Sequence, residues 1–223
     1  MLIVPAIIPS SKEELEHEIK LVAGFASTVQ IDICDGVFAP NKTWPYNGRD
    51  TEFFEELRAE HVGWPEWEKV DFELHLMVSD PLSKLSDWIS SGISSVIIHV
   101  ESTENFSEII DLCRNLNVGI GIALKPSTDL SKIKSFANNI DFIQLMGSDN
   151  LGYHGEALKE SAILKLKELR TTFPCKTIAV DIGVNEETAP ILAAAGANKL
   201  VAGGAILNSE NPEEIYKKLS NIV

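Results

Sequence analysis

The sequence predicts an α/β fold, a (β/α)8 TIM barrel formed by one domain that spans residues 1–223. First, eight short runs rich in β-branched residues alternate with eight amphipathic stretches along the chain. Second, the runs are hydrophobic almost throughout, which is typical of parallel strands that helices cover on the outside. Third, Ile7-Ile8-Pro9-Ser10 follows the first run where a doubly wound open sheet, the alternative, more often has a glycine-rich turn.

The expected strands are short and evenly spaced. Each is bounded by turn-forming residues or by the start of an amphipathic stretch. They are residues 2–7, 28–33, 71–77, 95–100, 118–124, 141–146, 176–181 and 198–203.

The expected helices lie between these strands, and several carry recognisable ends. Ser10 and Ser11 precede two glutamates as in a capping box, and Asp80-Pro81 places proline in a first turn. Gly92 and Gly196 follow helix ends, where a left-handed residue is favoured. The expected helices are residues 11–24, 51–60, 82–91, 104–115, 129–137, 156–171, 185–195 and 205–220.

Composition excludes several classes of function. A net charge of -14 argues against nucleic acid and anionic membranes, because both require a basic surface. No apolar run is long enough to cross a bilayer, and the first residues lack the basic region of a signal peptide. Three cysteines without paired spacing indicate a reducing, cytoplasmic compartment.

The stretch 42–70 is unusual because it holds Trp44, Trp64 and Trp67 between two expected strands. Long loops on barrels often serve as lids or as interfaces between subunits. We expect one of these two roles here, and we expect a homo-oligomer.

Three ionisable residues mark the ends of buried runs: Asp32, His75 and Asp181. The carboxyl ends of barrel strands meet at one face, so these side chains should converge there. Two carboxylates and an imidazole can hold a metal or exchange protons with a carbon acid. Asp181 could instead cap the next helix, but the spacing makes Asn185 the better cap. His99 is ambiguous between packing and the pocket.

Glycines gather after the last three strands and indicate an anion site. Glycine lets backbone N–H groups approach a ligand, and barrels often bind phosphate at the loops after strands seven and eight. The coincidence favours a phosphorylated substrate. The residues are Gly152, Gly155, Gly183, Gly203 and Gly204.

The ordered motifs resemble the ribulose-phosphate 3-epimerase family over nearly the whole chain. They are Asp32-Ile33-Cys34-Asp35-Gly36-Val37-Phe38-Ala39-Pro40-Asn41, Leu74-His75-Leu76-Met77-Val78-Ser79-Asp80-Pro81, His99-Val100-Glu101, Gln144-Leu145-Met146 with its glycine loop, Val180-Asp181 and Val201-Ala202-Gly203-Gly204-Ala205-Ile206.

The resemblance implies a ribulose-phosphate-binding barrel and an isomerase of carbohydrate metabolism that acts in the pentose phosphate pathway. Asp32 and Asp181 would exchange the proton at C3 of a ketopentose phosphate through an enediolate. With His75 they would also ligate a divalent metal (Zn, Fe, Mn or Co), and no organic cofactor is expected. Met77 and Met146 would pack around the reacting carbons. The phosphate and substrate contacts would come from Gly152, Tyr153, His154, Gly155, Ile182, Gly183, Gly203 and Gly204.

The chain departs from the family pattern at the site. Gln30 stands where the family has a second histidine ligand, and an amide oxygen is a poorer zinc ligand than imidazole. Ile182 replaces one glycine, and His154 replaces another. Ala6 stands for a serine and Cys34 for a third methionine, Leu151 is an extra residue, and the segment 44–68 is longer than in the family. These departures leave two alternatives open: a member that binds a sugar phosphate without epimerising it, and a lyase or aldolase that uses Lys125.

Overall fold

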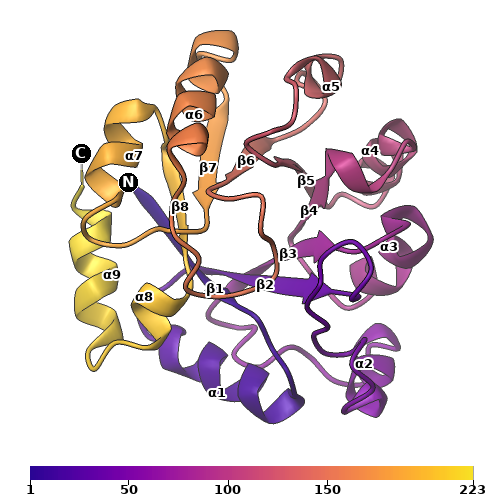
Figure 1. The fold of residues 1–223 in the computed structure, drawn as a ribbon. Coiled ribbons are helices and arrows are strands. Elements are labelled where there is room, and N and C mark those ends of the chain that lie inside the picture. The colour runs from indigo at the N-terminus through magenta and orange to yellow at the C-terminus, as the bar shows by residue number, and fades with distance from the viewer. Residues whose placement is uncertain (223) are drawn as a thin grey trace.

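The computed structural model describes residues 1–222 and shows a closed barrel of eight parallel strands in chain order (Figure 1). Strand β1 pairs with both β2 and β8, and this pairing closes the sheet. The barrel prediction is confirmed, and the doubly wound alternative is wrong. The strands are β1 Leu2–Ile7, β2 Thr28–Cys34, β3 Asp71–Met77, β4 Ser95–His99, β5 Gly119–Leu124, β6 Phe142–Met146, β7 Thr177–Asp181 and β8 Lys199–Ala202.

A ring of helices surrounds the barrel (Figure 1). The single helix expected over 205–220 is instead two helices, α8 and α9. Pro212 cannot donate an N–H within a helix, and it begins α9. The helices are α1 Lys12–Val22, α2 Thr51–Arg58, α3 Pro81–Ile89, the 3-10 turn η1 Val100–Ser102, α4 Phe106–Asn115, α5 Ser131–Lys134, α6 Glu160–Thr172, α7 Ala189–Ala195, α8 Gly204–Leu207 and α9 Pro212–Ser220. Within residues 1–222, none of these is long and apolar enough to cross a membrane.

The predicted helix ends are present. The Ser11 hydroxyl accepts the Glu14 N–H at 3.2 Å, and the Glu14 carboxylate accepts the Ser10 N–H at 2.7 Å. Gly92 and Gly196 have φ of 87° and 114°, the left-handed geometry that ends a helix. Local sequence therefore determines where these helices begin and end.

Side chains alternate along each strand between the outside of the barrel, beneath the helices, and its interior. On β2, Val29, Ile31 and Ile33 point outward and pack beneath the helices. Gln30 and Asp32 point into the barrel, and Asp32 is level with His75 in the neighbouring strand. The strand register therefore places polar side chains at one height inside the barrel.

The segment 42–70 is mainly part of the outer core. Trp44 is fully buried, Trp64 is 2% exposed, and the Trp44 ring lies 6.1 Å from that of Trp88 in α3. Trp67 alone of the three tryptophans in the segment remains 63% exposed. The burial of Trp44 and Trp64 is inconsistent with a lid or a subunit interface formed by those two side chains.

Candidate active site

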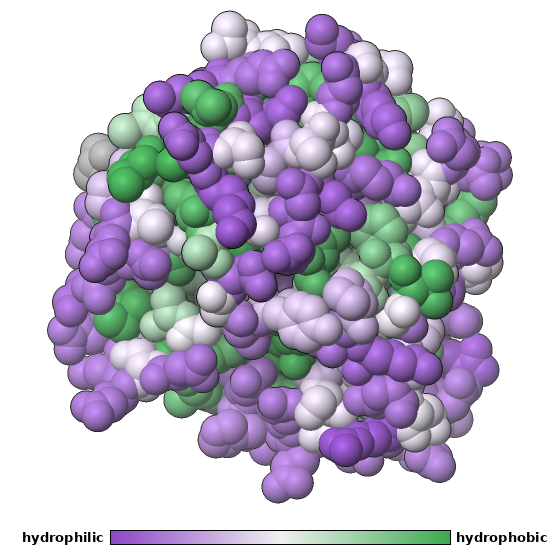
Figure 2. Space-filling view, in the orientation of Figure 1, coloured by the Kyte–Doolittle hydropathy of each residue, from purple (hydrophilic) through white to green (hydrophobic). Residues whose placement is uncertain are grey.

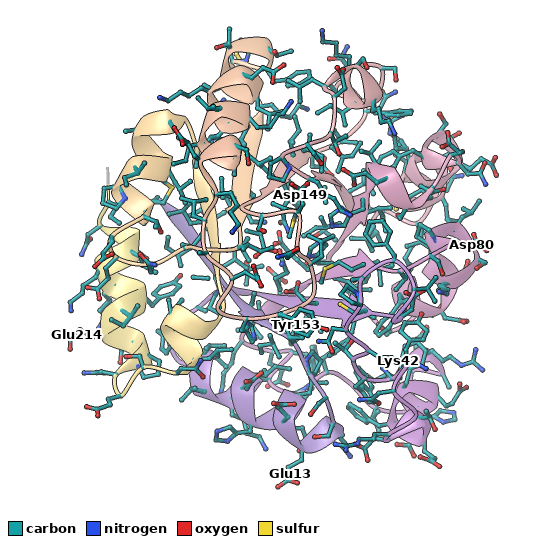
Figure 3. All side chains as sticks on the ribbon, viewed as in Figure 1. Glu13, Lys42, Asp80, Asp149, Tyr153 and Glu214 are labelled. Carbon is teal, nitrogen blue, oxygen red and sulfur yellow. The ribbon has the colours of Figure 1, made fainter. Side chains whose placement is uncertain are left out.

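A cavity of about 670 Å³ opens at the carboxyl ends of the strands. The β6–α6 loop, which carries Asp149 and Tyr153, crosses this end of the barrel (Figure 3). Hydrophilic residues cover most of the face around it (Figure 2). Twelve of the predicted site residues line the cavity: Asp32, Met77, Met146, Gly152, Tyr153, His154, Gly155, Asp181, Ile182, Gly183, Gly203 and Gly204.

The three predicted ionisable residues converge at the floor of this cavity. His75 Nδ1 lies 3.0 Å from Asp32 Oδ1 and 3.6 Å from Asp181 Oδ2. One potential ligand atom from each residue lies within 4.8 Å of the others. Both aspartates reach the cavity, whereas His75 is fully buried beneath them.

Gln30 lies among these groups and bridges them. Its amide nitrogen donates to Asp32 Oδ1 at 2.7 Å and to Asp181 Oδ2 at 3.1 Å, and it lies 3.4 Å from His75 Nδ1. The amide thus shields the two carboxylates from each other. The amide oxygen is buried and has no hydrogen-bond partner within residues 1–222.

Burial and neighbouring charges in the site shift the pKa values of Asp181 and His75. Burial, and then the charge of Asp32, raise the pKa of Asp181 more than His75 and Gln30 lower it. Burial alone would lower the pKa of His75, but the hydrogen bond to Asp32 and the charges of both aspartates outweigh burial and raise it. Asp181 therefore holds a proton closer to neutral pH than an ordinary aspartate does.

An apolar wall stands beside the carboxylates. Met77 and Met146 pack with Cys34, Ala39 and Leu151. Both methionines line the cavity. Burial, and then the charges of Asp32 and Asp35, raise the pKa of the Cys34 thiol, which keeps it protonated and apolar.

The glycine-rich end of the cavity closes around His154. The backbone turns left-handed at Gly152 and Gly183, with φ of 88° and 73°. The His154 ring lies directly against Gly203, at a distance that leaves no room for a Cβ there. A larger residue at position 203 would force the His154 ring to move.

Ile182 has the backbone conformation of a glycine. Its φ is 81°, which is an outlier for a β-branched residue. The Ile182 carbonyl packs against Gly147, where a side chain would collide with it. A β-branched residue therefore holds a backbone conformation that glycine adopts without strain.

Comparison with known proteins gives the family. A model of the ribulose-phosphate 3 epimerase family matches residues 2–207. The chain belongs to this family. It is 29% identical to ribulose-phosphate 3-epimerase of Schizosaccharomyces pombe, with 99% of this chain and 93% of the relative covered. It is 30% identical to that of Bacillus subtilis, with 97% of each chain covered.

More distant structures share the fold alone. The 3-hexulose-6-phosphate synthase of Salmonella typhimurium superposes with a TM-score of 0.72 at 14% identity, covering 100% of this chain and 98% of that one. The geometry gives no support to a Schiff-base lysine. Lys125 is absent from the described lining of the cavity, and its Nζ lies 5.2 Å from the centre of the Phe38 ring.

The residues at the floor fit a divalent cation. Two carboxylates and an imidazole nitrogen already converge there, and Gln30 adds an amide whose oxygen is unpartnered. Rotating the amide by half a turn exchanges its nitrogen and oxygen, so Gln30 can offer an oxygen where it now donates. The family position occupied by Gln30 is thus chemically compatible with a metal, with oxygen replacing nitrogen.

Sequence reasoning assigned no role to Gln144 or Glu101 and left His99 ambiguous between packing and the pocket. Gln144 Nε2 donates to Asp181 Oδ2 at 3.1 Å. His99 Nε2 lies 3.1 Å from His75 Nε2, and His99 Nδ1 lies 3.0 Å from Glu101 Oε2. The available signal was a polar residue inside an apolar strand, which identifies Gln144 and His99 on β6 and β4.

Proposed function

We propose that this chain is a ribulose-phosphate 3-epimerase that interconverts ribulose 5-phosphate and xylulose 5-phosphate. The observation that carries the proposal is the pair of carboxylates, Asp32 and Asp181, which reach one cavity from β2 and β7. Membership of the family and its named relatives support the same substrate.

The two aspartates divide the proton transfer between them. Asp32 removes the proton at C3 from one side of the sugar, and Asp181 delivers a proton from the other side. The raised pKa of Asp181, caused by burial and the charge of Asp32, suits the role of acid. In the reverse reaction the roles exchange. Gln30 and Gln144, which both donate to Asp181, hold its carboxyl group in place.

A divalent metal would be held by Asp32, His75 and Asp181, with the Gln30 amide oxygen as a fourth ligand. When bound, it would supply Lewis-acid stabilisation of the negative charge that develops on the substrate oxygens. An amide oxygen in place of a second imidazole makes the ligand set harder, which weakens its preference for Zn and makes it better suited to Mn than a site with two histidines.

The phosphate group would lie at the glycine-rich end. Barrels often bind phosphate between the loops after strands seven and eight, where a short extra helix begins. Gly183 follows β7, and Gly203 and Gly204 lead into the short helix α8. His154 and Tyr153 from the β6–α6 loop, with Gly152, Gly155 and Ile182, would complete this end. Met77 and Met146 would exclude water from the reacting carbons.

We also propose a cytoplasmic homo-oligomer. The free cysteines Cys34, Cys113 and Cys175 suit a reducing compartment. Trp67, exposed on the segment 42–70, suits a contact between subunits. Sedimentation of wild-type and Trp67→Ala protein tests the oligomer. A wild-type protein that sediments with the mass of a monomer would refute it.

The function is tested by following xylulose 5-phosphate formed from ribulose 5-phosphate, with Mn²⁺, Fe²⁺, Co²⁺ or Zn²⁺ supplied. Asp32→Asn and Asp181→Asn should each reduce kcat by about 100-fold or more, the usual contribution of acid–base catalysis. Turnover that survives both substitutions would refute the assigned roles. Tight binding of the sugar phosphate with no turnover under any condition would instead indicate a binding protein.

A further inference from the structure

His99 lies directly behind His75 and contacts it through ring nitrogens. Both side chains are fully buried, and their ring centroids lie 5.1 Å apart with 24° between the ring planes. The two Nε2 atoms are 3.1 Å apart. A hydrogen bond between two imidazole nitrogens needs one proton, so one Nε2 donates and the other accepts. The direction of this bond determines which nitrogen of His75 carries a proton.

Glu101 determines the direction from the far end. Its Oε1 accepts the Lys125 N–H at 2.8 Å and the Thr128 hydroxyl, and its Oε2 faces His99 Nδ1 at 3.0 Å. Burial would raise the pKa of Glu101, but these partners outweigh burial and lower it to about 2. An ionised carboxylate only accepts hydrogen bonds, so His99 Nδ1 must be the protonated nitrogen.

His99 then has one nitrogen left to face His75. His99 is fully buried, and its two ring nitrogens face one partner each, Glu101 at Nδ1 and His75 at Nε2. Full burial favours the neutral form of an imidazole, which carries one proton on the ring nitrogens. A neutral imidazole that is protonated at Nδ1 has a lone pair at Nε2. His75 must therefore donate its Nε2–H to His99. The direction holds whether or not His75 also carries a proton at Nδ1.

We propose that Glu101 and His99 are positioning residues that fix the tautomer of His75 and reserve its Nδ1 for the cavity floor. The chain of hydrogen bonds runs from Glu101 through His99 to His75, and the reserved nitrogen faces Asp32 and Asp181. Partners of this kind orient histidines that bind metals. The use of the nitrogen as a ligand rests on the proposed function, whereas the tautomer itself does not.

The first test reads the tautomer directly in metal-free wild-type protein. Long-range ¹H–¹⁵N spectra of histidine rings report which nitrogens carry protons. We expect a proton on Nδ1 of His99, none on its Nε2, and a proton on Nε2 of His75. A lone pair at His75 Nε2 would overturn the proposal. No substrate or metal is needed, so this result is independent of whether the protein is an epimerase.

The second test reverses the direction of the hydrogen bonds from Glu101 to His75. Glu101→Gln introduces an amide that can donate to His99 Nδ1, which allows His99 to donate to His75 and moves the His75 proton to Nδ1. We expect Mn²⁺ to bind about 10- to 100-fold more weakly, as is usual when such a partner is changed. Thr128→Val is the matched control, because it removes a different hydrogen bond to Glu101 and keeps the carboxylate.

The outcomes of the second test are separable. Thr128→Val should keep the wild-type tautomer and nearly the wild-type Mn²⁺ affinity. Equal weakening in both variants would show that general damage to the fold, and not the tautomer, is responsible, and it would overturn the proposal. An unchanged tautomer in Glu101→Gln would do the same. If Glu101→Gln does not fold, the wild-type spectrum still decides.

Discussion

Replacing Gln30 by leucine should destabilise the metal-free protein, because the amide nitrogen neutralises repulsion between two buried carboxylates. It donates to Asp32 at 2.7 Å and to Asp181 at 3.1 Å. Two hydrogen bonds to charged groups contribute about 3–6 kcal/mol together, and removing the unpartnered amide oxygen returns about 1–3 kcal/mol. The free energy of unfolding should therefore fall by about 2–3 kcal/mol.

Gln144→Leu is the matched control. Gln144 also has a buried, unpartnered amide oxygen within the described residues, but it gives only one hydrogen bond, to Asp181 at 3.1 Å. In Gln144→Leu the lost hydrogen bond and the removed unpartnered oxygen nearly offset each other. The expected change in the free energy of unfolding is therefore within about 1 kcal/mol. Urea unfolding of chelator-treated protein at pH 8 measures both variants. If Gln30→Leu is no less stable than Gln144→Leu, the bridging role assigned to Gln30 is wrong.

Substitutions at three further positions test separate parts of the structure. Ile182→Gly should be about 1 kcal/mol more stable than Ile182→Ala in urea unfolding, because φ is 81° there; the opposite order would contradict backbone strain. Burial, and then the charge of Glu14, raise the pKa of Glu18 to about 7 in the folded protein. Between about pH 4.5 and 7 the folded state therefore binds more protons than the unfolded state, and the free energy of unfolding falls as the pH rises through this range. Glu18→Gln should therefore gain about 1–2 kcal/mol at pH 8 after solvent screening is allowed for, and almost nothing at pH 4; an equal gain at both would refute this. His154→Ala should raise KM for the sugar phosphate several-fold with little change in kcat, whereas a lower KM would mean that the ring obstructs the phosphate.

Much of the fold could be predicted because its signals are local. The period of apolar residues gives the alternation of strands and helices, and Ser11, Gly92 and Gly196 mark helix ends that the structure confirms. Pro212, which divides the last helical stretch, is likewise a local signal, because proline disrupts the interior of a helix. The direction of the tryptophans in 42–70 was not visible, since composition does not reveal which way a side chain points.

The site could be predicted in part for a similar reason. Asp181 ends its buried strand, and Asp32 and His75 lie two residues before the ends of theirs; topology alone brings such ends together. His99 stayed ambiguous between packing and the pocket because its role depends on distances to His75 and Glu101, which no local pattern contains. The pairing of Glu73 with Lys199 at 2.7 Å across the barrel is likewise a product of closure.

The central claim is that this cavity exchanges the proton at C3 of ribulose 5-phosphate. The most direct measurement is incorporation of solvent deuterium, followed by NMR in D₂O with divalent metal supplied. We expect xylulose 5-phosphate that carries deuterium at C3 and none at the other carbons, with incorporation lost in Asp181→Asn. Product without deuterium at C3, or no exchange under any metal condition, would contradict it.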